Sequence, residues 1–299
     1  MLQFLTDLHQ FRFLQYALLA GIMASVACGI IGSYVTVRRL TYIAGAIAHC
    51  TLGGMGAARY LQQQYGLAFL TPLTGATIAA LVAALVISFL QGHSAMRQDT
   101  VLSAVWSVGM GIGILFISKT SGYNEDLMSY LFGDILMVSG RDLLLIGLLD
   151  LVLLLMVTLF YNRLLAISFD EEFARISGIA VDRCNTIFLC LVALTVVLLV
   201  QVVGIILVVA LLALPAAAAG RLTTRLPAMM LASTLLCLLA TSGGLALSYQ
   251  PDLPAGATII MLAAALYILV GIFWKLRNIH RRPPGKGPFL SLDEPGNIK

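Results

Sequence analysis

Long apolar runs without charge constrain the fold of this chain more than any other feature. A helix rises about 1.5 Å per residue, so about 20 apolar residues are needed to cross a hydrocarbon core of about 30 Å. Runs of comparable length, bounded by charged or turn-forming residues, lie at Leu14–Val37, Thr41–Ala58, Leu67–Leu90, Thr100–Ser118, Leu143–Tyr161, Thr186–Val200, Val203–Ala219, Ala228–Tyr249 and Ala255–Trp274. Only Gln201 and Gly204 separate the sixth run from the seventh, and a broken or re-entrant helix there would remove one span. The sequence therefore predicts an all-α fold, a polytopic membrane helical bundle with about 8–9 transmembrane helices.

The composition excludes several classes of protein. Charged residues make up 11% of the 299 residues, whereas a soluble domain carries about 25%. This excludes a soluble globular enzyme. The net charge of +4 is too small, and its basic residues are too scattered, to form a nucleic-acid surface. The five cysteines contain no CxxC pair, so we interpret them as small membrane residues and not as a disulfide or zinc framework.

Basic residues predict the orientation, because cytoplasmic loops retain Lys and Arg. With nine spans, the Lys- and Arg-rich C-terminal tail falls on the same side as most other basic residues. The residues on the opposite side are Arg12, Arg59, Lys119 and Arg141. We therefore expect a cell-membrane protein with an N-terminal extracytoplasmic segment (1–13), a transmembrane domain (14–276) and a flexible cytoplasmic tail (277–299).

Two connections are more than plain loops. On the outer side, residues 121–139 combine acids with an apolar stretch too short to cross the membrane, which indicates a short helix at the outer face. On the inner side, residues 168–181 begin with acids that suit a helix N-terminus, and Gly178 is expected to end this helix. Phe169, Phe173 and Ile176 recur at helical spacing in this segment. Periodicity alone is equally consistent with a connector lying on the surface and with a docking helix for a soluble partner.

Two ionisable residues are expected at membrane depth, where polar groups are costly and informative. His49 lies ten residues after Arg39, about 15 Å along a helix and close to the midplane. Asp150 lies at a comparable depth in the fifth run. An imidazole and a carboxylate together suit a divalent transition metal. We expect His49 to contact a metal or its pathway. For Asp150, a hydrogen bond to a neighbouring helix or subunit is the alternative.

Small residues and proline mark possible breaks in the helices. Gly53 and Gly54 follow His49 and allow either close helix packing or a locally opened helix. Pro215 is expected to kink or end the seventh span near its inner end. The sequence contains no GxSxG, HExxH or phosphate-binding loop. We therefore expect no enzymatic activity in this chain, and any ATP-driven work must be done by another chain.

Several stretches together carry a family resemblance. They are Arg38–Tyr42 with Ala46–His49, Asp126–Leu136, Ser168–Arg175, Val203–Ala217 and Asp252–Ile259. They resemble the ABC-3, or metal-chelate, family of ABC importer permeases for zinc, manganese and iron(II). The resemblance implies a vitamin-B12-type importer permease fold, a homodimer in membrane lipid, cytoplasmic ABC ATPase subunits and an extracytoplasmic metal-binding protein. It also implies that the segment near 169–178 is the ATPase coupling helix, with Phe169, Asp170, Glu171, Glu172, Phe173, Arg175 and Gly178 as its residues.

The chain departs from the family pattern at one position. The family usually has an aspartate four residues before the histidine, on the same helix face, whereas this chain has Gly45. Our hypothesis is that Asp150, or a group from a second subunit, supplies the missing carboxylate. We expect the metal to be cargo, with no cofactor bound stably.

Other classes of transporter stay open at this point. A permease for a larger chelate such as a siderophore would need a wide polar cavity. An ATP-independent secondary cation transporter would need several buried acids. The sequence does not choose between zinc, manganese and iron(II), because these ions share ligand types.

Overall fold

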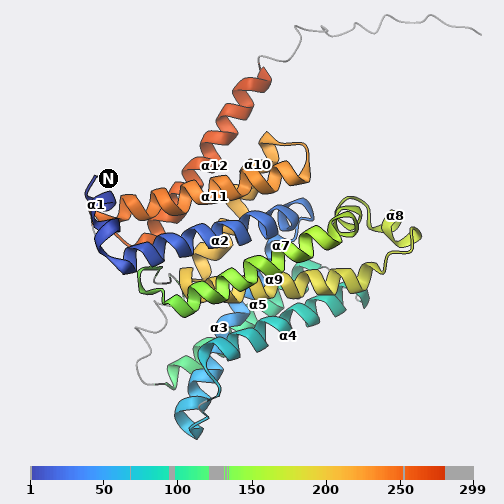
Figure 1. Ribbon diagram of the computed structural model, residues 1–299. Helices are drawn as coiled ribbons and strands as arrows, with labels where there is room; N and C mark the ends of the chain where they lie inside the picture. Colours follow the sequence, from blue (N-terminus) through green and yellow to red (C-terminus); the bar gives the residue numbers. More distant parts are fainter. Residues whose placement is uncertain are drawn as a thin grey trace, which may run out of the picture.

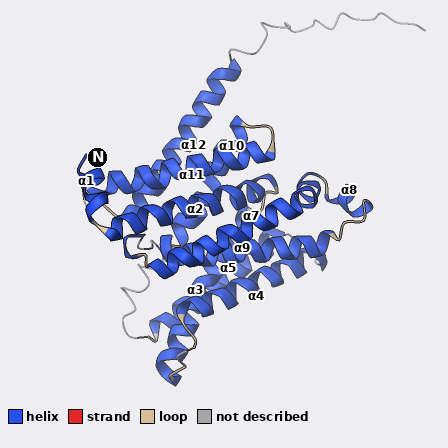
Figure 2. Ribbon diagram, in the orientation of Figure 1, coloured by secondary structure: helices blue, strands red, loops and turns tan. Residues whose placement is uncertain are grey.

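The computed structural model describes residues 2–67, 69–93, 98–120, 131, 133, 135–251 and 253–279, and in this part of the chain every regular element is helical (Figure 2). The elements are α1 (Leu2–Gln10), α2 (Arg12–Val37), α3 (Thr41–Tyr65), α4 (Pro72–His93), α5 (Gln98–Ser118), η1 (Ile135–Met137), α7 (Gly140–Phe169), α8 (Glu171–Ile176), α9 (Val181–Val203), α10 (Ile205–Leu222), α11 (Leu226–Tyr249) and α12 (Ala255–Ile279). Among the described residues, 8 helices are long and apolar enough to cross a membrane. The prediction of an all-helical membrane bundle is confirmed.

The long helix outside this set is α3, which still lies within the bundle. It is 25 residues long and ends in a polar segment that includes Gln62 and Gln63. Its first two thirds are largely buried, and it packs against α4, α5, α9 and α10. Protein neighbours therefore cover α3, which explains why it can hold polar residues such as His49.

Each predicted run corresponds to one long helix, but several boundaries differ. The connection between α3 and α4 ends later than expected, because α4 begins at Pro72, a residue type favoured in the first helical turn. In contrast, α7 continues past Tyr161 to Phe169, and α9 begins at Val181. Helices do not need to stop where the hydrocarbon stops, so hydropathy underestimates their length.

The break between α9 and α10 separates two full helices. Gly204 has φ of +84°, a conformation that glycine adopts without strain, and both α9 and α10 qualify separately as membrane spans. The alternative of one broken helix at this point is therefore wrong. A Cβ added at Gly133 would overlap the backbone of Val203 and Gly204, so Gly133 itself lies directly against this junction.

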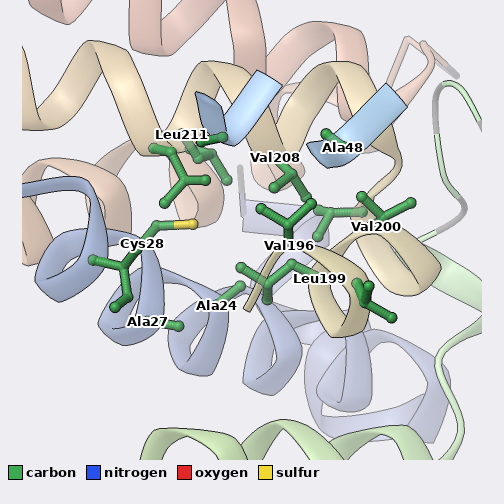
Figure 3. Packing of buried hydrophobic residues seen from close by; sticks show 14 of the residues in the cluster. Ala24, Ala27, Cys28, Ala48, Val196, Leu199, Val200, Val208 and Leu211 are labelled. Carbon is green, nitrogen blue, oxygen red and sulfur yellow. The ribbon is translucent and has the colours of Figure 1, made fainter. Parts of the chain in front are cut away.

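The helices form two groups joined by α9. α2, α10, α11 and α12 pack together, α3 packs with α4 and α5, and α9 contacts α2, α3, α4, α7 and α10 (Figure 1). Figure 3 shows the centre of this arrangement, where small side chains of α2 face larger aliphatic ones of α9 and α10. The labelled residues there are Ala24, Ala27, Cys28, Ala48, Val196, Leu199, Val200, Val208 and Leu211.

At both ends of the described chain, helices extend into the segments that the sequence predicts to lie outside the transmembrane domain. The N-terminal segment forms α1, where the Phe4 ring lies edge-on to Tyr249 and the Tyr249 hydroxyl donates to Asp7 at 2.9 Å. α12 continues to Ile279, beyond the predicted domain boundary at 276. Most of the predicted outer helix within 121–139, and the tail from 280 onward, lie outside the described residues, whereas Ile135–Met137 form the short 3-10 helix η1.

Candidate functional site

His49 lies on α3 where this helix packs tightly against α5. Gly53 and Gly56 of α3 face Gly109 and Gly113 of α5 so closely that an added Cβ at Gly53 would lie 2.6 Å from the Gly109 carbonyl oxygen. The absence of side chains lets the two backbones approach. This brings the His49 ring into a parallel stack on the Trp106 ring of α5, with centroids 4.5 Å apart and planes 10° apart.

One imidazole nitrogen of His49 is buried and uncommitted. Nδ1 has no hydrogen-bond partner among the described residues. The neighbouring Cys50 already has a hydrogen-bond partner, because its thiol donates to the carbonyl oxygen of Val105 at 3.3 Å. His49 is therefore a fixed ring with a free nitrogen, which is the form in which imidazole binds metal ions.

The glycines around His49 have different environments. Gly54 packs against Gly75 of α4, where no Cβ could be accommodated, so Gly53 and Gly54 both lie at close helix contacts inside a continuous helix. At Gly45, a Cβ would meet nothing within 4 Å. The packing of this chain does not force glycine at that position.

Asp150 is buried on α7, in a different part of the bundle. Its Oδ1 atom has no hydrogen-bond partner among the described residues. α7 packs against α2, α8 and α9, whereas α3 packs against α4, α5, α9 and α10, and these two helices share no extended interface. The fold of one chain therefore does not bring Asp150 and His49 together through helix packing. No group of three or more His, Cys, Asp or Glu suited to a metal ion occurs within the described ranges.

The predicted inner helix is present as α8. The Asp170 side chain accepts a hydrogen bond from the backbone N–H of Phe173 at 2.9 Å and so caps the helix, and Glu171 and Glu172 occupy the first turn, where the helix dipole favours acids. The chain leaves α8 through Gly178, whose φ is +81°. Arg175 then pairs with Asp182 at 3.0 Å, which ties α8 to the start of α9.

α8 exposes an apolar face. Phe173 is 64% exposed and Ile176 is 86% exposed, and Phe169, the last residue of α7, is 71% exposed. On the opposite face, Ala174 is fully buried in a small cluster with Ile167 and Val181. The helix is anchored by one side and presents large apolar side chains with the other, which is the pattern of a docking element.

Sequence reasoning missed the structural role of Arg38, which it used only as a basic residue that indicates orientation and as part of the stretch that carries the family resemblance. The Arg38 side chain is 6% exposed, and its Nη2 donates to Glu171 Oε1 at 2.9 Å and to Asn185 Oδ1 at 3.0 Å. It borders a polar cavity of about 850 Å³ between α4, α8 and α9, lined also by Gln91 and Asp182. The sequence shows Arg38 as a basic residue, but its acidic partner Glu171 lies 133 residues further along the chain.

Pro215 lies inside α10, which continues to Leu222. The proline therefore does not end the helix.

Comparison with known proteins decides the family. The model of the ABC 3 transport family matches residues 10–274. This chain belongs to the ABC 3 transport family. It is therefore a multi-pass membrane permease subunit of an ABC system, and not a catalytic chain. The ATPase of such a system is a separate partner.

Curated relatives and a solved structure agree with this assignment. A protein of Chlamydia muridarum named "Probable metal transport system membrane protein" is 38% identical over 85% of this chain and 86% of its own length. The "Manganese transport system membrane protein MntC" of Halalkalibacterium halodurans is 33% identical over 90% of each chain. The solved structure "PsaBC from Streptococcus pneumoniae in complex with Fab" superposes with a TM-score of 0.80 at 30% identity, covering 92% of this chain and 99% of that one.

Proposed function

We propose that this ABC 3 permease imports a divalent transition metal ion, with manganese(II) as the first candidate and zinc or iron(II) as the alternatives. The observation that carries the proposal is the His49 imidazole, which is held by Trp106 and keeps Nδ1 uncommitted. A buried nitrogen donor on an otherwise apolar span suits a borderline transition metal. The names of the Chlamydia and Halalkalibacterium relatives favour a metal cargo, and the second one favours manganese.

The pathway is proposed to form between two copies of the chain. α5 is little buried within one chain, and its Trp106, Val108 and Leu115 are exposed. A second copy packed on α5 would cover these side chains and enclose His49. The ion passes through as cargo, with no stably bound cofactor. Neither His49 nor Asp150 belongs to a cluster of three possible metal ligands in the described chain. Brief contacts between the ion and single side chains suit transport better than tight binding of the ion at one site.

The partners follow from the same proposal. The exposed face of α8 docks on a cytoplasmic ABC ATPase, and an extracytoplasmic binding protein delivers the ion at the opposite side of the membrane. This places α8, the α2–α3 turn and the C-terminus in the cytoplasm and α1 outside, as the basic residues indicate. Labelling of single cysteines introduced at exposed Phe173 and at exposed Phe69 with an impermeant thiol reagent, in a cysteine-free background, tests this orientation. Labelling of residue 173 from outside the cell would contradict it.

Metal uptake by the complete assembly tests the function. The permease, its ATPase and its binding protein are reconstituted in vesicles, and uptake of radioactive manganese is followed with and without ATP. We expect ATP-dependent uptake that excess unlabelled manganese suppresses and that a ferric siderophore leaves unchanged. Uptake that does not depend on ATP would overturn the ABC mechanism, and competition by the siderophore alone would assign a chelate as cargo. Competition by zinc or iron(II) in preference to manganese would reassign the ion.

A further inference from the structure

Arg38 occupies the short turn that joins α2 to α3, and the backbone holds it rigidly. The N–H of Arg38 donates to the Tyr34 carbonyl at 3.0 Å, and the N–H of Leu40 donates to the Val35 carbonyl at 2.8 Å. Arg39 between them has φ of +56°, a conformation that costs a residue with a side chain about 1 kcal/mol. A turn this tight makes Arg38 move together with the start of α3.

The Arg38 side chain links three other elements to this turn. It donates to Glu171 of α8 and to Asn185 of α9, and Asn185 Nδ2 donates in turn to Gln91 Oε1 of α4 at 3.3 Å. The guanidinium lies 5.3 Å from the centroid of the Phe188 ring of α9. The network therefore joins α8 to α4 and α9, two of the helices that pack against α3.

The two partners of the ion pair differ in exposure. The Arg38 side chain is 6% exposed, whereas that of Glu171 is 57% exposed. A buried cation that loses its partner is strongly destabilised, whereas an exposed carboxylate is readily hydrated. When α8 is displaced, Arg38 must follow Glu171 or be left buried without an acidic partner.

We propose that Arg38 is a positioning residue that transmits movement of the docking helix α8 to α3, the helix that carries His49. From Arg38 to His49 the chain advances 11 residues, about 16 Å along a helix axis. A shift or tilt imposed at the Glu171–Arg38 pair therefore changes the position of the His49 ring against Trp106. This inference rests on the proposed docking of α8 on an ATPase, and it adds the route by which that docking reaches the pathway.

The test measures how many metal ions are imported per ATP hydrolysed by the complete reconstituted assembly. Arg38→Gln removes the ion pair, and Arg39→Gln is the matched control, because Arg39 is adjacent, exposed and outside this network. We expect Arg38→Gln to co-purify with the ATPase and to hydrolyse ATP, but to import at least about fivefold fewer ions per ATP, the lower end of typical coupling between sites. We expect Arg39→Gln to behave as the parent.

Two further variants separate a transmitted movement from a simple structural role. Glu171→Gln changes only an exposed side chain, so it folds even if Arg38→Gln does not, and it should lower the same ratio. The exchange Arg38→Glu with Glu171→Arg restores an ion pair in reverse, and we expect it to recover at least half of the ratio lost in the single variants. A normal ratio in Glu171→Gln, or no recovery in the exchange, would overturn the proposal. If the Arg39→Gln control imports no divalent metal, it is the proposed function that fails.

Discussion

The two polar regions of this permease differ in how their hydrogen bonds are satisfied. Around the α2–α3 turn, Arg38, Glu171, Asn185 and Gln91 are joined in one continuous set of hydrogen bonds, although the nearby Tyr34 and Thr36 hydroxyls have no partner among the described residues. Deeper in the bundle, His49 Nδ1 and Asp150 Oδ1 have no such partner in the described part of the chain. The bonded set ties α4, α8 and α9 to the α2–α3 turn, whereas His49 Nδ1 and Asp150 Oδ1 contribute no hydrogen bond to the fold of the described chain.

This difference has an energetic basis. An unpaired buried polar group costs about 1–3 kcal/mol, so a chain retains one only where another contribution offsets the cost. A hydrogen-bonded set at the bundle edge is stabilising and gives a defined geometry. Substitutions in the first region should therefore change coupling or folding, and substitutions at the second should change transport with little effect on folding.

The largest effect is expected from His49→Ala. Loss of the imidazole should reduce ATP-dependent metal uptake at limiting metal by at least about tenfold, equivalent to about 1.4 kcal/mol of lost interaction. The thermal midpoint of the detergent-solubilised assembly should fall only by the lost stacking on Trp106, because Nδ1 makes no hydrogen bond within the described chain. Cys50→Ala is the matched control on the next residue, since its thiol is bonded to Val105. Equal uptake by the two variants would contradict the assignment of His49 to the pathway.

A smaller effect is expected when the apolar face of α8 is removed together with its acids. Glu171→Lys, Glu172→Lys and Phe173→Ala combined should uncouple ATP hydrolysis from uptake by about five- to tenfold, within the usual range of coupling between sites. The measurement is the ratio of the two rates in vesicles. Phe69→Ala, which removes an equally large exposed ring far from α8, should leave the ratio unchanged. Normal transport by the triple variant would show that α8 is not the docking helix.

Asp150→Asn tests whether the Asp150 carboxylate, which has an oxygen without a hydrogen-bond partner among the described residues, serves the same pathway as His49. If Asp150 replaces the carboxylate missing at Gly45, uptake at limiting metal should fall about three- to fivefold, which corresponds to less than about 1 kcal/mol. The neutral side chain keeps the size of aspartate, so the fold is preserved. Uptake identical to the parent would remove Asp150 from the pathway and leave it a structural residue of α7.

The smallest effect is expected from Gly45→Asp, which adds a carboxylate one turn before His49. The site can accept a Cβ, since nothing lies within 4 Å of that position. Two ligands on one helix face should lower the metal concentration for half-maximal uptake about threefold, equivalent to about 0.6 kcal/mol. Gly53→Asp is the contrasting variant, and we expect it to fail in assembly because it would collide with Gly109. An unchanged concentration dependence would show that the face of Gly45 does not meet the ion.

Much of the fold could be predicted from local patterns. Span length is set by membrane thickness, and α8 is marked by its cap, its acids and its terminal glycine, all within ten residues. The Arg38–Glu171 pair could not be predicted, because nothing local to Arg38 specifies an acid 133 residues away. The relative placement of His49 and Asp150 also depends on how each helix is rotated about its axis. The helix α7, which carries Asp150, has weak hydrophobic asymmetry and so gives little information about its own rotation.

The 30-residue length of α7 has a mechanical consequence. At about 1.5 Å per residue this helix is about 45 Å long, roughly 15 Å more than a hydrocarbon core requires. The helix is therefore long enough to extend beyond the hydrocarbon core, and α8 follows directly from its C-terminal end. Under the proposed docking of an ATPase on α8, any displacement of α8 is applied directly to the C-terminal end of this long helix.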